Sequence, residues 1–189
     1  MSPYGTSKLM TEVMLRDAAS ASGPTYAVLR YFNVAGADPL LRTGQSTKAA
    51  THLIKVAVQA ARGIREGMEI FGTDYPTPDG TCIHEYIHVC DLVSAHNNAL
   101  DYLRRGGASV TLNCGYGQGY SVRQIVEAVQ RVSGSNFAVT PPPRRDGDPA
   151  AVVADSRLMR RLLSWQPAFD DIDTIVGHAL AWERKLTVQ

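Results

Sequence analysis

The sequence predicts an α/β fold, and three features support that class. Segments patterned like strands alternate with segments patterned like helices along the 189 residues. Hydrophobic residues make up 44% and charged residues 20%, which is typical of a globular chain and not of a disordered one. Most segments are also bounded by a residue that caps or stops them. A chain of this length can bury a substantial core.

The first third of the chain is expected to contain two helices and a buried strand. Ser2 suits the N-cap of the first helix, Pro3 suits its first turn, and Gly23 with Pro24 ends it. The next elements are expected as a strand at 25–32, a loop at 34–48 and a helix at 49–62.

The remaining elements follow the same alternation. Ser121 and Gln124 form a capping box, which predicts a helix directly after them. The glycine-rich turn at 115–119 lacks the G-x-G-x-x-G spacing, so a tight connection is favoured over a phosphate cradle. Three aspartates are expected to cap helices: Asp91, Asp155 and Asp170. Strands are expected at 68–71, 82–89, 110–113 and 137–140, with a turn-rich loop at 72–80.

Composition argues against several classes of protein. Nineteen basic and 18 acidic residues leave a net charge of +1, so no nucleic-acid or membrane partner is expected. No apolar run approaches the roughly 18 residues of a membrane helix, and no signal peptide is expected at the start. The three cysteines lack a C-x-x-C motif, which favours reduced thiols and a cytoplasmic location.

Three motifs contain residues that could carry chemistry. Tyr4 and Lys8 share one helix face, where an ammonium favours the phenolate needed for proton transfer; the spacing alone is more often a solvated face. The arginines at 144–145 could bind phosphate or lie in a solvated loop. His84 and His88 match H-E-x-x-H, but the segment is predicted as a strand. Residues four apart on a strand lie roughly 13 Å apart, so no zinc site is expected.

In order, five motifs closely resemble those of the UDP-glucose 4-epimerase family of extended short-chain dehydrogenase/reductases. They are S-P-Y-G-T-S-K-L at 2–9, L-R-Y-F-N-V-A-G-A at 29–37, I-F-G-T-D-Y-P-T-P-D-G-T at 70–81, Y-I-H-V-C-D-L at 86–92 and R-R-D-G-D at 144–148. The stretch at 70–81 is the most specific of them. The resemblance implies the C-terminal part of a Rossmann-type fold together with the smaller, mixed α/β substrate-binding domain.

The same resemblance implies a division of the chain and an incomplete enzyme. Residues 1–40 would be a remnant of the NAD-binding Rossmann domain, holding its catalytic helix and the following strand. Residues 41–189 would form mainly the UDP-sugar-binding domain, with segments such as 110–113 returning to the Rossmann sheet. The family's glycine-rich NAD-binding half would precede Met1. We therefore expect a fragment that is inactive alone and belongs to a homodimer when complete.

The implied activity is the NAD-dependent interconversion of UDP-galactose and UDP-glucose through a 4-keto sugar. By resemblance, Tyr4 is the acid/base, Lys8 favours its phenolate and holds the cofactor ribose, and Phe32 lies near the nicotinamide. The substrate-binding residues implied in the same way are Asn33, His52, Leu53, Glu69, Ile70, Phe71, His84, Arg145, Asp148 and Val152. Among them, Asn33 and Arg145 would meet the phosphates and Asp148 the uridine ribose, with Phe71 stacked on the uracil.

Two departures from the family pattern concern the substrate. His84 and Glu85 stand where the family usually has arginine and aspartate, which predicts weaker UDP binding that improves below about pH 6.5. Val152 is small where some members carry tyrosine, which would leave room for an N-acetyl group. Three alternatives to the UDP-glucose 4-epimerase activity remain. They are an epimerase for UDP-N-acetylglucosamine or UDP-xylose/arabinose, an inactive fragment that binds nucleotide sugar weakly, and a zinc hydrolase built on residues 84–88.

Overall fold

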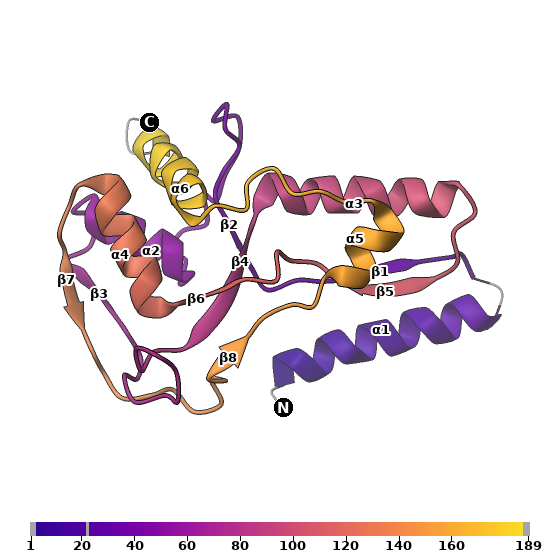
Figure 1. Ribbon diagram of the computed structural model, residues 1–189, viewed down its shortest axis with the longest axis horizontal. Coiled ribbons are helices and arrows are strands. Elements are labelled where there is room, and N and C mark those ends of the chain that lie inside the picture. Colours follow the sequence, from indigo (N-terminus) through magenta and orange to yellow (C-terminus); the bar gives the residue numbers. More distant parts are fainter. Residues whose placement is uncertain (1–2, 22, 187–189) are drawn as a thin grey trace.

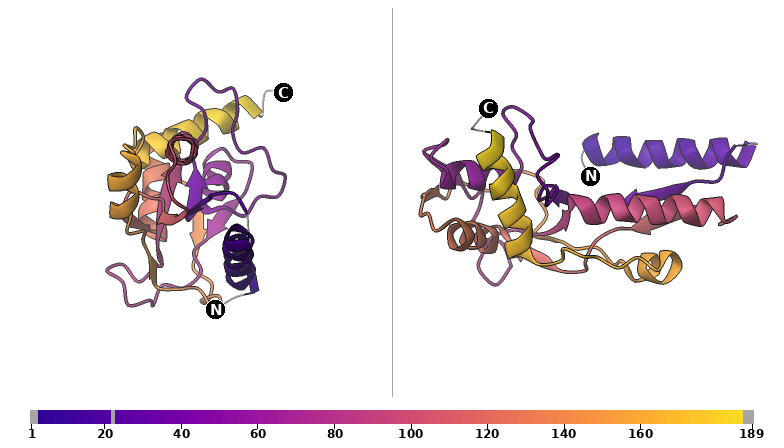
Figure 2. Two further views of the ribbon diagram at one scale, coloured as in Figure 1. Left: turned by 90° about the vertical axis from the view of Figure 1, so that its right-hand side faces the viewer. Right: turned by 90° about the horizontal axis from the view of Figure 1, so that it is seen from above.

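A computed structural model describes residues 3–21 and 23–186 as an elongated, mixed α/β molecule (Figure 1, Figure 2). The helices are α1 (Pro3–Ala21), α2 (Leu53–Ala61), α3 (Val89–Arg104), α4 (Val122–Ser133), α5 (Arg157–Leu163) and α6 (Ile172–Leu186). The strands are β1 (Ala27–Arg30), β2 (Asn33–Ala35), β3 (Gly67–Glu69), β4 (Ile83–His88), β5 (Val110–Asn113), β6 (Gly119–Ser121), β7 (Ala138–Thr140) and β8 (Ala151–Val152).

Strand β4 is the centre of the sheet structure. Its C-terminal half pairs in parallel with β2, with Asn33 opposite Tyr86. Its N-terminal half pairs with β6 in the antiparallel direction and with β8 in parallel, which places Val152 opposite His84. The parallel pairs β1–β5 and β3–β7 lie at the two ends of the molecule (Figure 1).

Two hydrophobic clusters fill the two ends. The first lies among α2, α4 and α6, whose apolar side chains recur at helical spacing, as Ile54, Ala57 and Val58 do on α2. The second lies among α3, α5 and β5 and is centred on Trp165, which is 1% exposed. Tyr86 belongs to the first cluster and its neighbour Ile87 to the second, so β4 connects them.

Helix α1 lies beside the β1–β5 end and buries none of its described residues. The side chains of Met10 and Met14 on this helix are both more than half exposed. The helix is held to β1 by a bidentate ion pair, in which Arg30 donates to Glu12 at 2.8 and 2.5 Å. The expected N-cap Ser2 lies outside the described residues.

Several predicted boundaries are wrong, and each error has a local cause. The helix expected from Ala49 begins at Leu53, because Ala49 has a φ of +53° and His52 is extended. The strand expected at 25–32 is shorter and comprises only β1, and a separate strand, β2, follows it and extends into the predicted loop. Part of the predicted glycine-rich turn forms β6, because it pairs with β4.

The expected caps are confirmed only in part. The capping box of α4 is present, and Gly134 ends that helix with a φ of +70°. Asp91 does not cap α3; the imidazole of His88 does, accepting from the Cys90 amide at 3.1 Å. Asp155 accepts from the Arg157 amide as expected, although Ser156 is the N-cap residue. At α6 the accepting carboxylate belongs to Asp171 rather than Asp170.

Candidate active site

A cavity of about 820 Å³ lies where β2, β3, β4, β7 and the start of α2 meet. This volume is typical of a small-molecule site. Its lining is Asn33, Thr51, His52, Leu53, Val56, Arg65, Glu66, Gly67, Met68, Glu69, Phe71, Cys82, His84, Tyr86, Val122, Ala138, Thr140, Arg145 and Asp148. These residues come from segments far apart in the chain, so the cavity forms only when the fold is complete.

Most of the residues predicted to bind the substrate line this cavity. The eight that do are Asn33, His52, Leu53, Glu69, Phe71, His84, Arg145 and Asp148. Ile70 does not line it, because its side chain is 4% exposed and belongs to the first hydrophobic cluster. Val152 does not line it either; it lies on β8, paired opposite His84.

An aromatic ring and a cation are held together at one wall of the cavity. The guanidinium carbon of Arg145 lies 4.4 Å from the centre of the Phe71 ring, and Nε of Arg145 donates to Asp148 at 3.2 Å. The amides of Ile70 and Gly72 donate to the carbonyls of Thr140 and Pro142 at 2.9 Å, which extends the β3–β7 pairing past both strands. This extension brings the segment at 70–72 alongside the segment at 140–145. The arrangement suits a planar base and an anionic group.

His84 occupies the wall formed by β4. Burial lowers the pKa of His84 below its ordinary value; among nearby charges, Asp148 raises it and Arg145 lowers it further. Its imidazole is therefore neutral at pH 7. A neutral imidazole donates one hydrogen bond and brings no charge to a phosphate.

Glu85 is a buried carboxylate that joins three segments behind the cavity. It is 2% exposed. One of its oxygens accepts from the amides of Tyr116 and Gly117, the latter at 2.8 Å, and the other accepts from the Ala154 amide at 2.6 Å. Gly115 makes room for it, because a Cβ there would collide with the carboxylate. Glu85 thereby fixes the chain beyond β8 next to β4, where His84 pairs with Val152.

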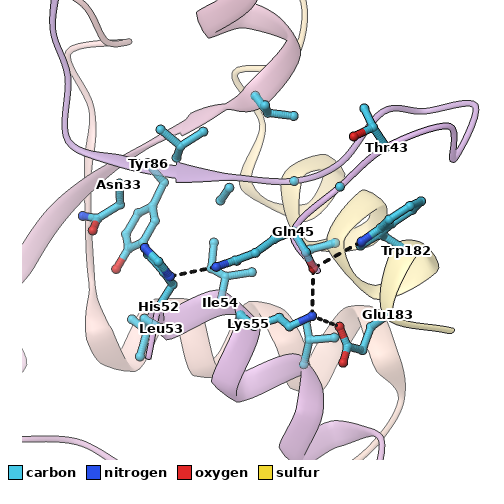
Figure 3. Close-up of a pocket in the computed structure, with 17 residues that line it drawn as sticks. Asn33, Thr43, Gln45, His52, Leu53, Ile54, Lys55, Tyr86, Trp182 and Glu183 are labelled. Carbon is cyan, nitrogen blue, oxygen red and sulfur yellow. Dashed lines mark hydrogen bonds and ion pairs between the residues drawn. The ribbon is translucent and has the colours of Figure 1, made fainter. Parts of the chain in front are cut away.

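A smaller cavity of about 350 Å³ adjoins the large one, between β2, α2 and α6 (Figure 3). The two cavities share Asn33, His52, Leu53 and Tyr86. Sequence reasoning missed Tyr86, which reads as an ordinary strand residue. It also missed Arg65, whose guanidinium is fixed by the side chain of Gln59 at 2.8 Å and the carbonyl of Ala50 at 3.3 Å.

The predicted catalytic pair lies outside the lining of both cavities. Tyr4 and Lys8 share one exposed face of α1, and Nζ of Lys8 lies 5.2 Å from the centre of the Tyr4 ring. The Tyr4 side chain is 73% exposed. Phe32 follows β1 and is 41% exposed. All three residues are exposed, and none of them lines either cavity.

The H-E-x-x-H motif occupies residues 84–88 of β4, and the segment is thus a strand, as its β-rich composition predicts. His84 faces the cavity, whereas His88 is fully buried and hydrogen-bonded to the Cys90 amide and to His178 at 3.0 Å. Within residues 3–21 and 23–186, no group of three histidine, cysteine, aspartate or glutamate side chains is placed to hold a metal ion.

None of the helices in the described part of the chain is long and apolar enough to cross a membrane.

The parallel strand pairs, the covering helices and the cavity beyond the strands define a mixed α/β protein with a Rossmann-like fold. The chain belongs to the NAD dependent epimerase/dehydratase family, whose family model matches residues 1–115.

Relatives in sequence and in structure include UDP-glucose 4-epimerases. A UDP-glucose 4-epimerase of Azospirillum brasilense is 58% identical over 186 residues, which are 98% of this chain and 53% of that protein. The structure of a Brucella ovis UDP-glucose 4-epimerase in complex with NAD has a TM-score of 0.91 at 43% identity, covering 96% of this chain and 56% of that one. A Stenotrophomonas maltophila enzyme with bound NAD and formylated UDP-arabinopyranose has a TM-score of 0.94 at 38% identity, covering 100% and 56%. The chain thus spans about half the length of these relatives.

Proposed function

We propose that this chain supplies the substrate-binding part and the catalytic Tyr4–Lys8 pair of a UDP-glucose 4-epimerase. The observation that carries the proposal is the gathering of eight predicted substrate-binding residues around one cavity. The relatives at 58% and 43% identity, both UDP-glucose 4-epimerases, support the same activity. The substrate would be UDP-galactose or UDP-glucose.

The nucleotide of the substrate would occupy the large cavity. Phe71 offers a flat surface to the uracil, and Glu69 lies beside it on the same wall. Arg145 offers a planar pair of donors to a phosphate, and Asp148 offers an acceptor to a ribose hydroxyl. On binding, the diphosphate would compete with Asp148 for Arg145, whose mutual bond is exposed.

Tyr4 would act at the sugar hydroxyl. As a phenolate it accepts the proton of the 4-hydroxyl, and it returns that proton after the 4-keto sugar has turned over. Lys8 would hold its positive charge beside the Tyr4 ring, whose centre lies 5.2 Å from Nζ. Both side chains lie on an exposed face of α1, so packing within the described part of the chain does not cover them.

The same residues fit part of a nicotinamide cofactor. The hydroxyl of Tyr4 and the ammonium of Lys8 suit a ribose, and the ring of Phe32 suits the nicotinamide. NAD supplies hydride chemistry at C4 of the sugar when it is bound. The sequence contains no G-x-x-G-x-x-G turn for the cofactor phosphates. We therefore expect the 189 residues to be inactive alone and active once a glycine-rich NAD-binding half accompanies them.

The organisation and setting of the complete protein belong to the same proposal. Residues 1–40 would be part of the NAD-binding domain, and residues 41–189 would form mainly the UDP-sugar-binding domain. The exposed face of α1 supports a homodimer contact. Cys82, Cys90 and Cys114 are free, which supports a reducing, cytoplasmic setting.

Calorimetric titration of the chain with UDP tests the substrate-binding half of the proposal. Saturable binding is expected, and Arg145→Ala should weaken it by about ten- to a hundredfold, since a hydrogen bond to a charged group contributes roughly 1.5–3 kcal/mol. Arg161→Ala is the matched control, because Arg161 is exposed on α5 and outside the cavity lining. Absence of saturable binding, or equal weakening by both variants, would contradict the proposal.

A further inference from the structure

Gln45 lies at the centre of a hydrogen-bond network in the loop between β2 and α2 (Figure 3). Its side-chain Nε2 lies 2.8 Å from Nδ1 of His52. Its backbone carbonyl accepts from Nζ of Lys55 at 2.9 Å and from Nε1 of Trp182 at 3.2 Å. The side chain and the main chain of Gln45 therefore have separate partners.

The main chain of Gln45 is held firmly by elements that do not depend on its side chain. Lys55 forms a buried ion pair with Glu183, which also accepts from Gln59 at 3.1 Å. Gly44 lies against the indole of Trp182, where a Cβ would come within 2.5 Å of the ring. A substitution at position 45 that changes only the side chain should leave these contacts in place.

The hydrogen bond to His52 selects one form of the imidazole. An amide nitrogen donates hydrogen bonds and does not accept them, so Nδ1 of His52 must be the acceptor. The ring proton of the neutral imidazole then resides on Nε2. A proton on Nδ1 would point at the amide hydrogens of Gln45. Of the two tautomers of a neutral imidazole, the contact thus selects the one whose donor, Nε2–H, lies on the side of the ring away from Gln45.

His52 also stands between the two cavities, since it lines both. Its Nδ1 is engaged by Gln45, which lines the small cavity. The remaining nitrogen, Nε2, is available as a hydrogen-bond donor to a ligand in the large cavity. His84, which is neutral at pH 7, and Arg145 line the same cavity.

We propose that Gln45 is a positioning residue, which holds the imidazole of His52 with its Nε2–H donor toward the anionic part of the bound nucleotide. The proposal rests on the proposed function, because it takes the ligand of the large cavity to be a nucleoside diphosphate. Gln45 itself does not line that cavity. It acts only through His52, and the rest of its contacts fix the loop.

The first test is the protonation state of His52 in the free protein. Long-range ¹H–¹⁵N spectra of the chain, with His52→Ala to assign the signals, should show an unprotonated Nδ1 and a protonated Nε2. In Gln45→Leu this preference should be lost. In Gln45→Glu the carboxylate should draw the proton to Nδ1. A His52 in the parent chain that already carries its proton on Nδ1 would overturn the proposal.

The second test is a double-mutant cycle on UDP affinity. Gln45→Leu and His52→Ala should each weaken binding about three- to tenfold at pH 7.5, and the double variant should be no weaker than His52→Ala alone. In Gln45→Glu the affinity should rise between pH 7.5 and 5.5 more steeply than in the parent, since the carboxylate favours the imidazolium. Equal losses from Gln45→Leu with and without His52 would overturn the proposal. A parent chain that does not bind UDP would instead count against the proposed function.

Discussion

Replacement of Glu85 by glutamine should destabilise the protein strongly, although the two side chains have nearly the same shape. The carboxylate accepts three backbone hydrogen bonds, from Tyr116, Gly117 and Ala154. An amide has one accepting oxygen, so it can satisfy at most the donors on one side. Its NH₂ group would then face a backbone N–H, either that of Ala154 or those of the other two residues.

The expected cost follows from these bonds. A bond to a charged acceptor contributes about 1.5–3 kcal/mol and a neutral bond about 0.5–1.5 kcal/mol, so changing two bonds costs about 2 kcal/mol. Leaving one buried donor unpaired adds about 1–3 kcal/mol, and relief from burying a charge offsets part of the sum. We expect a net loss of about 3 kcal/mol. This loss corresponds to a fall in Tm of about 6–12 °C for a chain of this size.

Urea unfolding at pH 7.5, followed by tryptophan fluorescence, measures this loss. Glu127→Gln is the matched control, because Glu127 is exposed on α4 and should change the free energy of unfolding by less than about 0.5 kcal/mol. UDP affinity should fall in Glu85→Gln as well, since Glu85 anchors the chain beyond β8 to the strand that holds His84. A Glu85→Gln variant as stable as the control would refute the structural role assigned to this carboxylate.

Three further predictions concern the site and its neighbours. His84→Arg should tighten UDP binding by about tenfold at pH 7.5. The affinity of the parent chain for UDP should instead improve only at a pH below the ordinary histidine pKa of about 6.5, because burial lowers the pKa of His84. Calorimetric titration with UDP at several pH values measures both effects. Burial, with a smaller effect of His178, lowers the pKa of His88 to about 4. Unfolded His88 therefore takes up a proton before folded His88 does, and the free energy of unfolding should fall as the pH drops from about 6.5 toward 4, less so in a His88→Asn variant. In a chain completed with the N-terminal half of the Azospirillum brasilense relative, Tyr4→Phe should lower kcat by about 10²–10⁴-fold and leave UDP affinity within twofold, whereas a comparable loss of affinity would place Tyr4 in binding rather than catalysis.

The sequence predicted the elements whose determinants are local. The capping box at Ser121 and Gln124 lies within one turn, so the start of α4 could be located without the fold. The start of α2 could not, because the left-handed backbone of Ala49 depends on the packing of the preceding loop. Strand β8 could not be predicted either, since its two residues pair with β4 and the chain after it is fixed by Glu85.

The residues of the candidate site divide in the same way, into those that the sequence identifies and those that only the fold brings together. Family resemblance named eight of the 19 residues that line the cavity, and four of these eight, Asn33, Phe71, Arg145 and Asp148, lie in the motifs that carry the resemblance. Gln45 was missed, since its partners Lys55 and Trp182 are 10 and 137 positions away and nothing around it suggests a role. Ile70 was also named by the resemblance, but alternation along an extended chain turns its side chain into the core.

The epimerisation of a UDP-sugar by the completed chain tests the central claim most directly. The N-terminal half of the Azospirillum brasilense relative, joined ahead of Ser2, would be incubated with NAD and UDP-galactose, and the sugar followed by ¹H NMR. We expect conversion to UDP-glucose, the same final ratio when UDP-glucose is the starting sugar, and no conversion by the 189 residues alone. A completed chain that binds both UDP and NAD but interconverts neither sugar would contradict this claim.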